Sequence, residues 1–392
     1  MSQPDQPNDF ISFSPPCLGD EEIDEVIDTL RSPWITTGPK VRQFEQEFAS
    51  MTGAPEEMGV NSCTSALELA LEALGIGKGD EVITTTLTFA ATVNVIERRG
   101  ARPVLVDVEP DTLNIDPQCV ADAITPKTAA IIPVHFAGHP VEMTPLIALA
   151  GRHNLAIVED AAHALPAAYH GEKVGGSSRL TAFSFYATKN YTTTEGGMLT
   201  GDPKLLERAR IMSLHGMSRN AWARYSEKGS WFYEVIAPGF KCNMTDVQAA
   251  IGLHQIKKMD CFQTRRQEIW QTYNDAFAGR TELQTPTIRG GIDHAMHLYV
   301  LRLTDEAAIS RNDLIESLKE QRIGTSVHFI PIHLHPYYRD TYGLRAEDFP
   351  VALSNFHRML SLPLNVQISN DQVRRVVDAV LGLTSSASRT AA

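Results

Sequence analysis

Two residues that follow apolar runs could carry out chemistry together. The run Leu155–Asp160 is apolar and ends in two carboxylates, and Lys189 follows the aromatic run Ala182–Tyr186. In an open α/β sheet, ligands bind beyond the carboxyl ends of the strands, so Asp160 stands where a binding acid belongs. Taken alone, Asp160 is more often a helix cap or a loop acid, and Lys189 is more often a surface lysine at a strand end.

The pair together indicates pyridoxal phosphate (PLP) chemistry. A lysine beside a buried strand is costly to desolvate unless it is neutral or covalently used. In PLP enzymes a lysine bonds covalently to the cofactor aldehyde, and an acid keeps the pyridine nitrogen protonated so that the ring can accept electrons. The separation of Asp160 and Lys189 leaves room for one crossover between two strands.

The segment "NSCTSAL" (Asn61–Leu67) is suited to bind a phosphate. Thr64 or Ser65 is expected to begin a helix, and the free N–H groups at a helix N-terminus bind anions. Phe89, within the hydroxyl-rich stretch "TTTLTFAAT", could stack on a flat ring. An ordinary helix cap and an ordinary core aromatic are the alternatives for these residues.

Alternating strand and helix patterns are expected to position these residues. The predicted strands are Glu81–Thr85, Pro103–Asp107, Ala129–Val134 and Ala156–Glu159. The predicted helices are Asp20–Arg31, the one that Thr64 or Ser65 begins, Ala90–Arg98, Pro117–Ile124 and Val141–His153. This alternation predicts a doubly wound, mostly parallel α/β sheet.

The pattern changes after about Asn243. A long helical stretch, Thr245–Phe277, precedes two predicted strands, His297–Leu303 and Gly324–His328, and a final helix, Asp371–Leu381. We therefore predict a large α/β domain over residues 12–250 and a smaller C-terminal α+β domain over residues 251–384. Residues 1–11 and 385–392 are predicted to be flexible tails.

Composition restricts the classes of function. The net charge of −12 over 392 residues disfavours binding to nucleic acid or to an anionic membrane, although a local pocket can still bind an anion. No apolar run reaches the roughly 18 residues that span a bilayer, and the N-terminus lacks the pattern of a secretory signal. Five cysteines without a CxxC pair favour a reducing cytoplasm.

Three histidines near the C-terminus could suggest a metal site. His328, His333 and His335 lack a carboxylate or cysteine at ligand spacing, so no metal is expected.

The motifs of the chain, in their order, resemble those of the DegT/StrS-type sugar-nucleotide aminotransferases, which are PLP enzymes of fold type I. The resemblance extends from about Ile11 to Leu383. It is carried by "WITTGPKVRQFEQEFA", "NSCTSALELAL", "DEVITTTLTFAATVNVI", "PVLVDVEPDTLNID", "PVHFAGHP", "VEDAAHA", "FSFYATKN", "EGGML", "GFKCNMTDVQAAIG" and "HFIPIHLHPYY". It implies the fold-type-I architecture and PLP as the cofactor.

The resemblance assigns four residues to the reacting part of the cofactor. Lys189 would be the catalytic lysine, and Asp160 would be the partner of the pyridine nitrogen. His163 would contact the phenolic oxygen of PLP, and Phe89 would stack on the ring.

Other residues would bind the phosphate and the substrate. Thr64, Ser65 and Ser184 match the phosphate ligands of the family. Asn243 resembles the residue that reaches the phosphate from the second subunit, which implies a homodimer with shared active sites. His328 would lie in the sugar-nucleotide pocket.

The implied reaction moves an amino group from L-glutamate to a nucleotide-linked keto sugar. The "GFKCNM" segment is more similar to members that aminate C4 than to members that aminate C3, which favours a 4-keto-6-deoxyhexose. A C3-keto sugar is the alternative acceptor. A sugar dehydratase of the same fold, in which a histidine replaces the lysine, is disfavoured by Lys189. A regulatory protein that lost the chemistry is disfavoured by the full set of cofactor residues.

Overall fold

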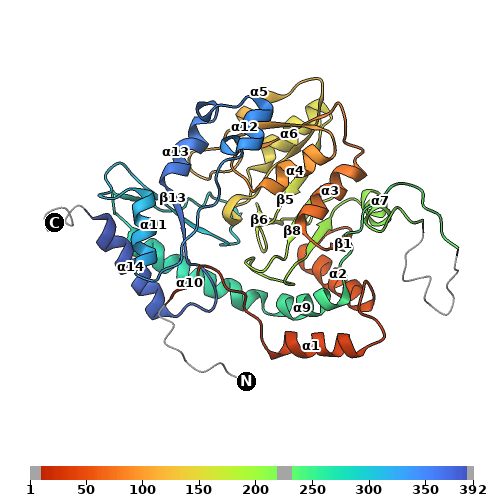
Figure 1. The fold of residues 1–392 in the computed structure, drawn as a ribbon, viewed down its shortest axis with the longest axis horizontal. Helices are drawn as coiled ribbons and strands as arrows, with labels where there is room; N and C mark the ends of the chain where they lie inside the picture. Colours follow the sequence, from red (N-terminus) through yellow and green to blue (C-terminus); the bar gives the residue numbers. More distant parts are fainter. Residues whose placement is uncertain (1–9, 219–231, 386–392) are drawn as a thin grey trace.

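The computed structural model of the chain describes residues 10–218 and 232–385 (Figure 1). Most of the two predicted tails, residues 1–9 and 386–392, therefore lies outside the described residues. Ile11, the last residue of the predicted N-terminal tail, is buried, and its backbone forms hydrogen bonds with Arg322 and Gly324. The prediction of a tail through residue 11 is wrong at Ile11, because its side chain belongs to the core.

A seven-stranded sheet forms the centre of the molecule (Figure 1). In order across the sheet the strands are β1 (Glu57–Val60), β9 (Gly197–Thr200), β8 (Leu180–Ser184), β5 (Ala156–Asp160), β4 (Thr128–Ile132), β2 (Glu81–Thr85) and β3 (Arg102–Val106). Strands β8, β5, β4, β2 and β3 pair in parallel, whereas β9 is antiparallel to both of its neighbours. The predicted mostly parallel sheet is confirmed, and its four predicted strands lie close to their expected bounds.

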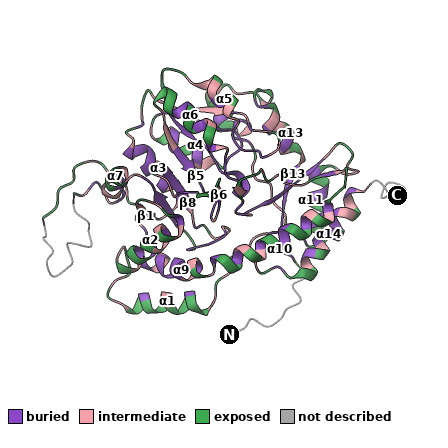
Figure 2. Ribbon diagram, turned by 180° about the vertical axis from the view of Figure 1, so that it is seen from behind, coloured by how far each residue is buried: buried purple, intermediate pink, exposed green. Residues whose placement is uncertain are grey.

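Helices cover both faces of the sheet, as a doubly wound fold requires. On one face lie α3 (Cys63–Ala73), α4 (Ala90–Arg98) and α7 (Pro203–Ser213). On the other face lie α2 (Pro39–Thr52), α5 (Pro117–Ala123), α6 (Met143–His153) and α9 (Asp246–Lys257), with α1 (Asp20–Arg31) packed on α9. Consecutive strand residues point to opposite faces, so Val82 packs with α3 and Ile83 packs with α5 and α6. Figure 2 shows the central strands as buried.

The C-terminal part of the chain packs on a second, antiparallel sheet, β10 (Leu283–Gln284), β12 (Tyr299–Leu303) and β13 (Met359–Leu362). Its core includes side chains of α10 (Met259–Phe277), α11 (Arg311–Glu320) and α14 (Asn370–Thr384). The remaining elements are α12 (Pro336–Tyr342), α13 (Pro350–Arg358) and a small sheet of β11 (Ile292–Asp293), β6 (Ala168–Tyr169) and β7 (Glu172–Lys173). The domain limits 12–250 and 251–384 stay a prediction. No helix in the described ranges has the length and apolar character needed to span a membrane.

Two predicted elements of this part are wrong. The stretch Thr245–Phe277 is not one helix, because the chain tightens at Lys258 (φ −91°, ψ −2°), whose N–H donates to Gln255 and Ile256 in place of the carbonyl four residues back. The segment Gly324–His328 is not a strand. Its only ladder contact is a single bridge between Ser326 and Ser361, because the chain then turns so that the following residues line a cavity.

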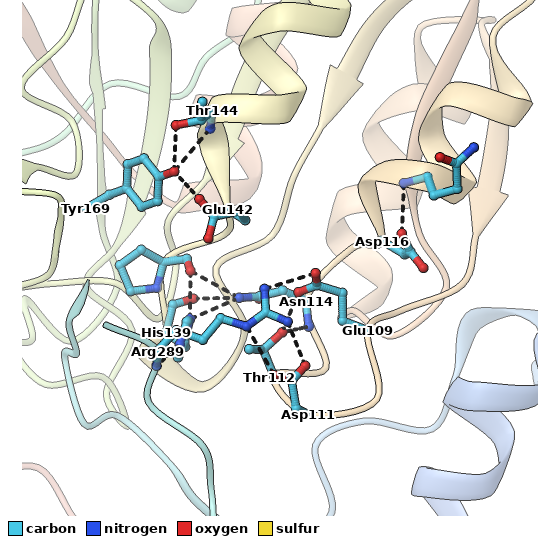
Figure 3. Close-up of polar contacts among 12 residues, drawn as sticks. Glu109, Asp111, Thr112, Asn114, Asp116, His139, Glu142, Thr144, Tyr169 and Arg289 are labelled. Atoms are coloured by element: carbon cyan, nitrogen blue, oxygen red, sulfur yellow. Dashed lines mark hydrogen bonds and ion pairs between the residues drawn. The ribbon is translucent and has the colours of Figure 1, made fainter. Parts of the chain in front are cut away.

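Two arginines join the loop after β3 to the C-terminal part of the chain. Arg289 donates two hydrogen bonds to Asp111, at 3.1 and 2.8 Å, and one to Glu109 at 3.0 Å (Figure 3). Arg302 of β12 is buried and donates to the carbonyl oxygens of Pro110 (2.6 Å) and Asp111 (3.1 Å). Because charge-assisted bidentate bonds are among the stronger hydrogen bonds, this loop is held firmly against the C-terminal part.

Candidate active site

A cavity of about 540 Å³ lies at the carboxyl ends of β5 and β8. The predicted site residues that line it are Thr64, Phe89, Asp160, His163, Ser184, Lys189 and His328. These residues come from distant parts of the sequence, and the ends of the parallel strands bring them together. The structure does not bring Ser65 and Asn243 to the lining of this cavity in a single chain.

Asp160 is the last residue of β5, and its carboxylate is buried at the cavity wall. Its Oδ2 accepts a hydrogen bond from the Thr92 hydroxyl at 2.8 Å, and its Oδ1 accepts one from the Ala162 N–H at 3.1 Å. Burial raises the pKa of Asp160, whereas these hydrogen bonds and the nearby Lys189 amine oppose that rise. The carboxylate is therefore held in one orientation by two donors.

The other carboxylate of the same strand end, Glu159, points to the opposite side of the sheet. It accepts a hydrogen bond from Arg179 Nε at 2.7 Å and contacts His135 Nε2 at 3.1 Å. His135 Nδ1 accepts the N–H of Val141, so Nε2 carries the proton that it donates to Glu159. Only Asp160 of the two acids faces the cavity.

Lys189 lies in the loop after β8 and is partly buried, with its side chain at the cavity wall. Burial lowers the pKa of Lys189 to about 8, although the carboxylate of Asp160 acts in the opposite direction. The loop is fixed by the Lys189 N–H, which donates to the Tyr186 carbonyl at 2.9 Å, and by the Ser14 hydroxyl, which donates to the Thr188 carbonyl at 3.0 Å. An amine with a pKa near neutrality is available as a nucleophile and as a base.

Helix α3 begins at Cys63, one residue before Thr64 and two before Ser65. Ser62 is the N-cap and accepts the Ser65 N–H at 3.1 Å, and Cys63 is the first helical residue. The Ser65 hydroxyl donates to Asn61 Oδ1 at 2.7 Å, whereas Ser62 and Thr64 line the cavity. The prediction that Thr64 or Ser65 begins the helix is wrong, because Ser62 has the extended backbone and the hydroxyl that a cap needs.

Gly197 of β9 shows how closely the backbone approaches the start of α3. A Cβ atom at this position would lie 2.6 Å from the Cys63 nitrogen, 2.6 Å from the Ser62 carbonyl carbon and 2.7 Å from the Phe183 oxygen. All three are backbone atoms, so glycine is required. The first N–H groups of a helix have no partner within the helix, and those of α3 lie at the cavity where they can bind a phosphate.

His163 carries a buried polar atom that PLP would satisfy. No described residue gives its Nδ1 a hydrogen-bond partner. Burial, then Lys189 and His328, lower the pKa of His163 well below its ordinary value, so the ring is neutral. Its ring packs against His297 with centroids 4.5 Å apart. An unpaired buried polar atom is costly, and an oxygen of a bound cofactor would remove that cost.

Phe89 and His328 form parts of the cavity wall. Phe89 is the N-cap residue of α4, and its side chain is 62% exposed, with its ring 5.8 Å from that of Phe329. His328 Nδ1 lies 2.9 Å from the Ser361 hydroxyl, and its ring stacks on Phe13. Burial and the Lys189 amine lower the pKa of His328 to about 4. An exposed aromatic face, a desolvated amine, a buried acid and a helix N-terminus together fit PLP.

Asn243 lies beside β1, the edge strand of the large sheet. Its Nδ2 donates to the Thr37 hydroxyl at 2.6 Å, and its Oδ1 accepts a hydrogen bond from Lys241. Within one chain it therefore contacts residues outside the cavity, and the second-subunit role stays a prediction.

Sequence reasoning missed other lining residues, notably Ser62, Thr88, Thr92 and His297. Thr88 and Thr92 carry a detectable signal, because they are four residues apart on either side of Phe89 and so can face the same side at a helix start. His297 gives no such signal, since its place depends on the packing of the C-terminal part. The residues that the structure describes contain no group of three or more His, Cys, Asp or Glu side chains arranged to hold a metal ion.

The mostly parallel sheet, with a lysine and an acid at neighbouring strand ends beside a helix N-terminus, defines a PLP enzyme of fold type I. The chain belongs to the DegT/DnrJ/EryC1/StrS aminotransferase family, whose model matches residues 16–381. It is therefore a PLP-dependent aminotransferase, and the predicted family, fold, cofactor and enzyme class are confirmed.

Individual relatives match over nearly the whole chain. Spore coat polysaccharide biosynthesis protein SpsC of Bacillus subtilis is 50% identical over 383 residues, covering 97% of this chain and 98% of the relative. Uncharacterized protein MJ1066 of Methanocaldococcus jannaschii is 52% identical over 379 residues, covering 95% and 98%. The solved structure of the putative sugar aminotransferase Spr1654 from Streptococcus pneumoniae, in its PMP form, matches with a TM-score of 0.90 at 35% identity, covering 95% of this chain and 98% of that one.

Proposed function

We propose that this aminotransferase moves the amino group of L-glutamate to the ketone of a nucleotide-linked sugar, a 4-keto-6-deoxyhexose. The observation that carries the proposal is the cavity in which the Lys189 amine, with a pKa of about 8, lies near the buried Asp160 carboxylate. A sugar acceptor is supported by the names of SpsC, a polysaccharide biosynthesis protein, and of Spr1654, a putative sugar aminotransferase. The "GFKCNM" segment favours C4 over C3 as the aminated carbon.

PLP, when bound, supplies an electron sink for the negative charge that develops on the substrate carbon. The Lys189 Nζ atom accepts the proton from the α-carbon of the donor and returns it during transfer. The Asp160 carboxylate holds a positive charge at the ring nitrogen of the cofactor. The Thr64 and Ser184 hydroxyls and the N–H groups at the start of α3 bind the phosphate. His163 Nδ1 bonds to the phenolic oxygen.

A screen of keto-sugar nucleotides tests this function. The PLP-loaded protein is incubated with 15N-labelled L-glutamate and each sugar, and the products are analysed by mass spectrometry and NMR. We expect one heavy amino group at C4 of a 6-deoxyhexose and 2-oxoglutarate in equal amount, and no product from Lys189→Ala. Amination at C3 would support the alternative acceptor, and loss of a hydroxyl without gain of nitrogen would identify a dehydratase.

We also propose a homodimer in which each active site uses residues of both subunits. Helix α1 turns the polar Glu22 and Thr29 inward and leaves Ile23 (52%), Ile27 (38%) and Leu30 (60%) exposed. An exposed apolar stripe at helical spacing is typical of an interface. Among the described residues that line the cavity, Lys189 is the only lysine or arginine, so one chain supplies little positive charge for an anionic ligand.

Subunit mixing tests the shared site. Lys189→Ala and Asn243→Ala chains are each expected to be inactive or weak, and each should sediment as a dimer. After the two are unfolded and refolded together, a mixed dimer has one site with both native residues, so activity returns. If Asn243 served its own subunit, the mixture would be no more active than the sum of its parents. Ile27→Glu is expected to convert the dimer to monomers.

A cytoplasmic location is a further part of the proposal. All five cysteines are free thiols, as expected in a reducing compartment. Fractionation of cells that express the tagged protein tests it, and recovery outside the cytoplasmic fraction would contradict it.

A further inference from the structure

A chain of two threonine hydroxyls leads to the acid of the site. The Thr88 and Thr92 hydroxyl oxygens are 2.8 Å apart, and the Thr92 hydroxyl donates to Asp160 Oδ2 at 2.8 Å. Both threonines are about 1% exposed, and both line the cavity. The chain therefore connects the start of α4 with the end of β5 inside the site.

The direction of this chain follows from the chemistry of its members. An ionised carboxylate only accepts hydrogen bonds, and a hydroxyl has one proton to donate. Thr92 uses its proton on Asp160, so its oxygen must accept the proton of Thr88. The second carboxylate oxygen accepts the Ala162 N–H at 3.1 Å. Every protein donor to Asp160 thus favours its ionised form.

We infer that Thr92, supported by Thr88, is a positioning residue that keeps the Asp160 carboxylate ionised and aimed at the ring nitrogen of PLP. Phe89 lies between the two threonines in sequence and also lines the cavity. The same short segment therefore orients the acid and supplies an aromatic face of the site. Asp160 needs this support because its burial disfavours a charge.

Other charged or titratable groups also act on Asp160, so the experiment must separate them from Thr92. Lys189 lies after β8, His135 lies after β4, and Cys63 lies at the start of α3. Thr92→Val removes one hydrogen bond and leaves these three groups unchanged. Thr84→Val is the matched control, because Thr84 is equally buried and its hydroxyl donates at 2.7 Å to the Ile132 carbonyl instead of the acid.

The first measurement is the dissociation constant for PLP, by titration of the PLP-free protein without substrate. We expect Thr92→Val to weaken PLP about tenfold or more, the usual effect of losing a hydrogen bond to a charged group. Thr92→Ser should restore the affinity, Thr84→Val should keep it, and Thr88→Val should weaken it less than Thr92→Val. The inference rests on PLP as the cofactor and not on the proposed sugar, so it stands if no keto sugar is accepted.

The second measurement is a double-mutant cycle with Asp160→Asn. Because Thr92 acts through Asp160, adding Thr92→Val to Asp160→Asn should change PLP affinity by less than twofold. The rate constant of the half-reaction with L-glutamate should fall in Thr92→Val while the half-saturating glutamate concentration stays constant. Full additivity in the cycle would overturn the inference. So would equal losses in Thr92→Val and Thr84→Val, or failure of Thr92→Ser to restore affinity. If Thr92→Val does not fold, the cycle is run with Thr88→Val, and the same outcomes decide it.

Discussion

Lys189 in the PLP-free protein should capture PLP with a pH dependence centred near 8. Its pKa is about 8 because burial disfavours the ammonium form. At pH 7 the neutral fraction of such an amine is about one in ten, against about one in 3,000 for an ordinary lysine. Only the neutral amine attacks the aldehyde, so capture at pH 7 should be roughly 300-fold faster than by an unperturbed lysine of equal access.

Stopped-flow absorbance of the visible band that forms on PLP binding measures this rate. Between about pH 6 and about pH 10, the logarithm of the rate constant should rise with unit slope and then level off near pH 8. Asp160→Asn removes a carboxylate that raises the pKa of Lys189, so the bend should move to lower pH. A rate that rises without a bend to about pH 10, or a bend that moves upward in Asp160→Asn, would refute the reasoning.

Three further predictions concern stability. Gly197→Ala should destabilise the fold by more than about 3 kcal/mol in urea and abolish PLP binding, because its Cβ would meet backbone atoms. Gly151→Ala, with open space at the Cβ, should be neutral or stabilising by up to about 1 kcal/mol, and an equal effect of the two changes would count against the packing argument. Burial raises the pKa of Glu159, but the hydrogen bond from His135 and the ion pair with Arg179 outweigh burial and hold the pKa below the ordinary 4.5. The ionised Glu159 therefore stabilises the fold above pH 4.5, and this stabilisation is lost as the pH falls below that value. In a plot of unfolding free energy against pH, Glu159→Gln should reduce the loss of stability at acid pH. An unchanged loss at acid pH would contradict the assignment. Arg289→Ala should lower the free energy of unfolding by about 1 kcal/mol, since its ion pair with Asp111 is partly exposed. An unchanged urea midpoint would show that Arg289 does not stabilise the contact between the loop after β3 and the C-terminal part.

Sequence patterns predicted the central sheet well because buried parallel strands leave short continuous apolar runs and amphipathic helices leave a periodic pattern. The strand Glu81–Thr85 and the helix Ala90–Arg98 have the predicted bounds. The segment Gly324–His328 contains the β-branched residues Thr325 and Val327, which favour a strand. A strand also needs a continuous partner, and the composition of the segment does not show whether one lies alongside. The break at Lys258 is one residue long, and no glycine or proline marks it in the sequence.

The part of the candidate site that could be predicted consists of residues whose side chains suit only a few chemical roles. Lysine and acid at strand ends indicated PLP, and the structure places Lys189 and Asp160 at one cavity. The hydroxyl that caps α3 was not predictable, because "NSCTS" offers three hydroxyl residues within four positions and only the backbone selects Ser62. The spacing of Thr92 from Thr88 was visible in the sequence, but its hydrogen bond to Asp160 depends on how the start of α4 lies beside the end of β5.

Borohydride reduction of the PLP-loaded protein, followed by peptide mass mapping, tests most directly that Lys189 carries the cofactor of an aminotransferase. Reduction fixes PLP to the lysine that holds it. We predict one pyridoxyl group, on Lys189, and its loss when L-glutamate is added before reduction, because the cofactor has then left the lysine with the amino group. Labelling of another lysine, or labelling of Lys189 that glutamate leaves unchanged, would contradict the account.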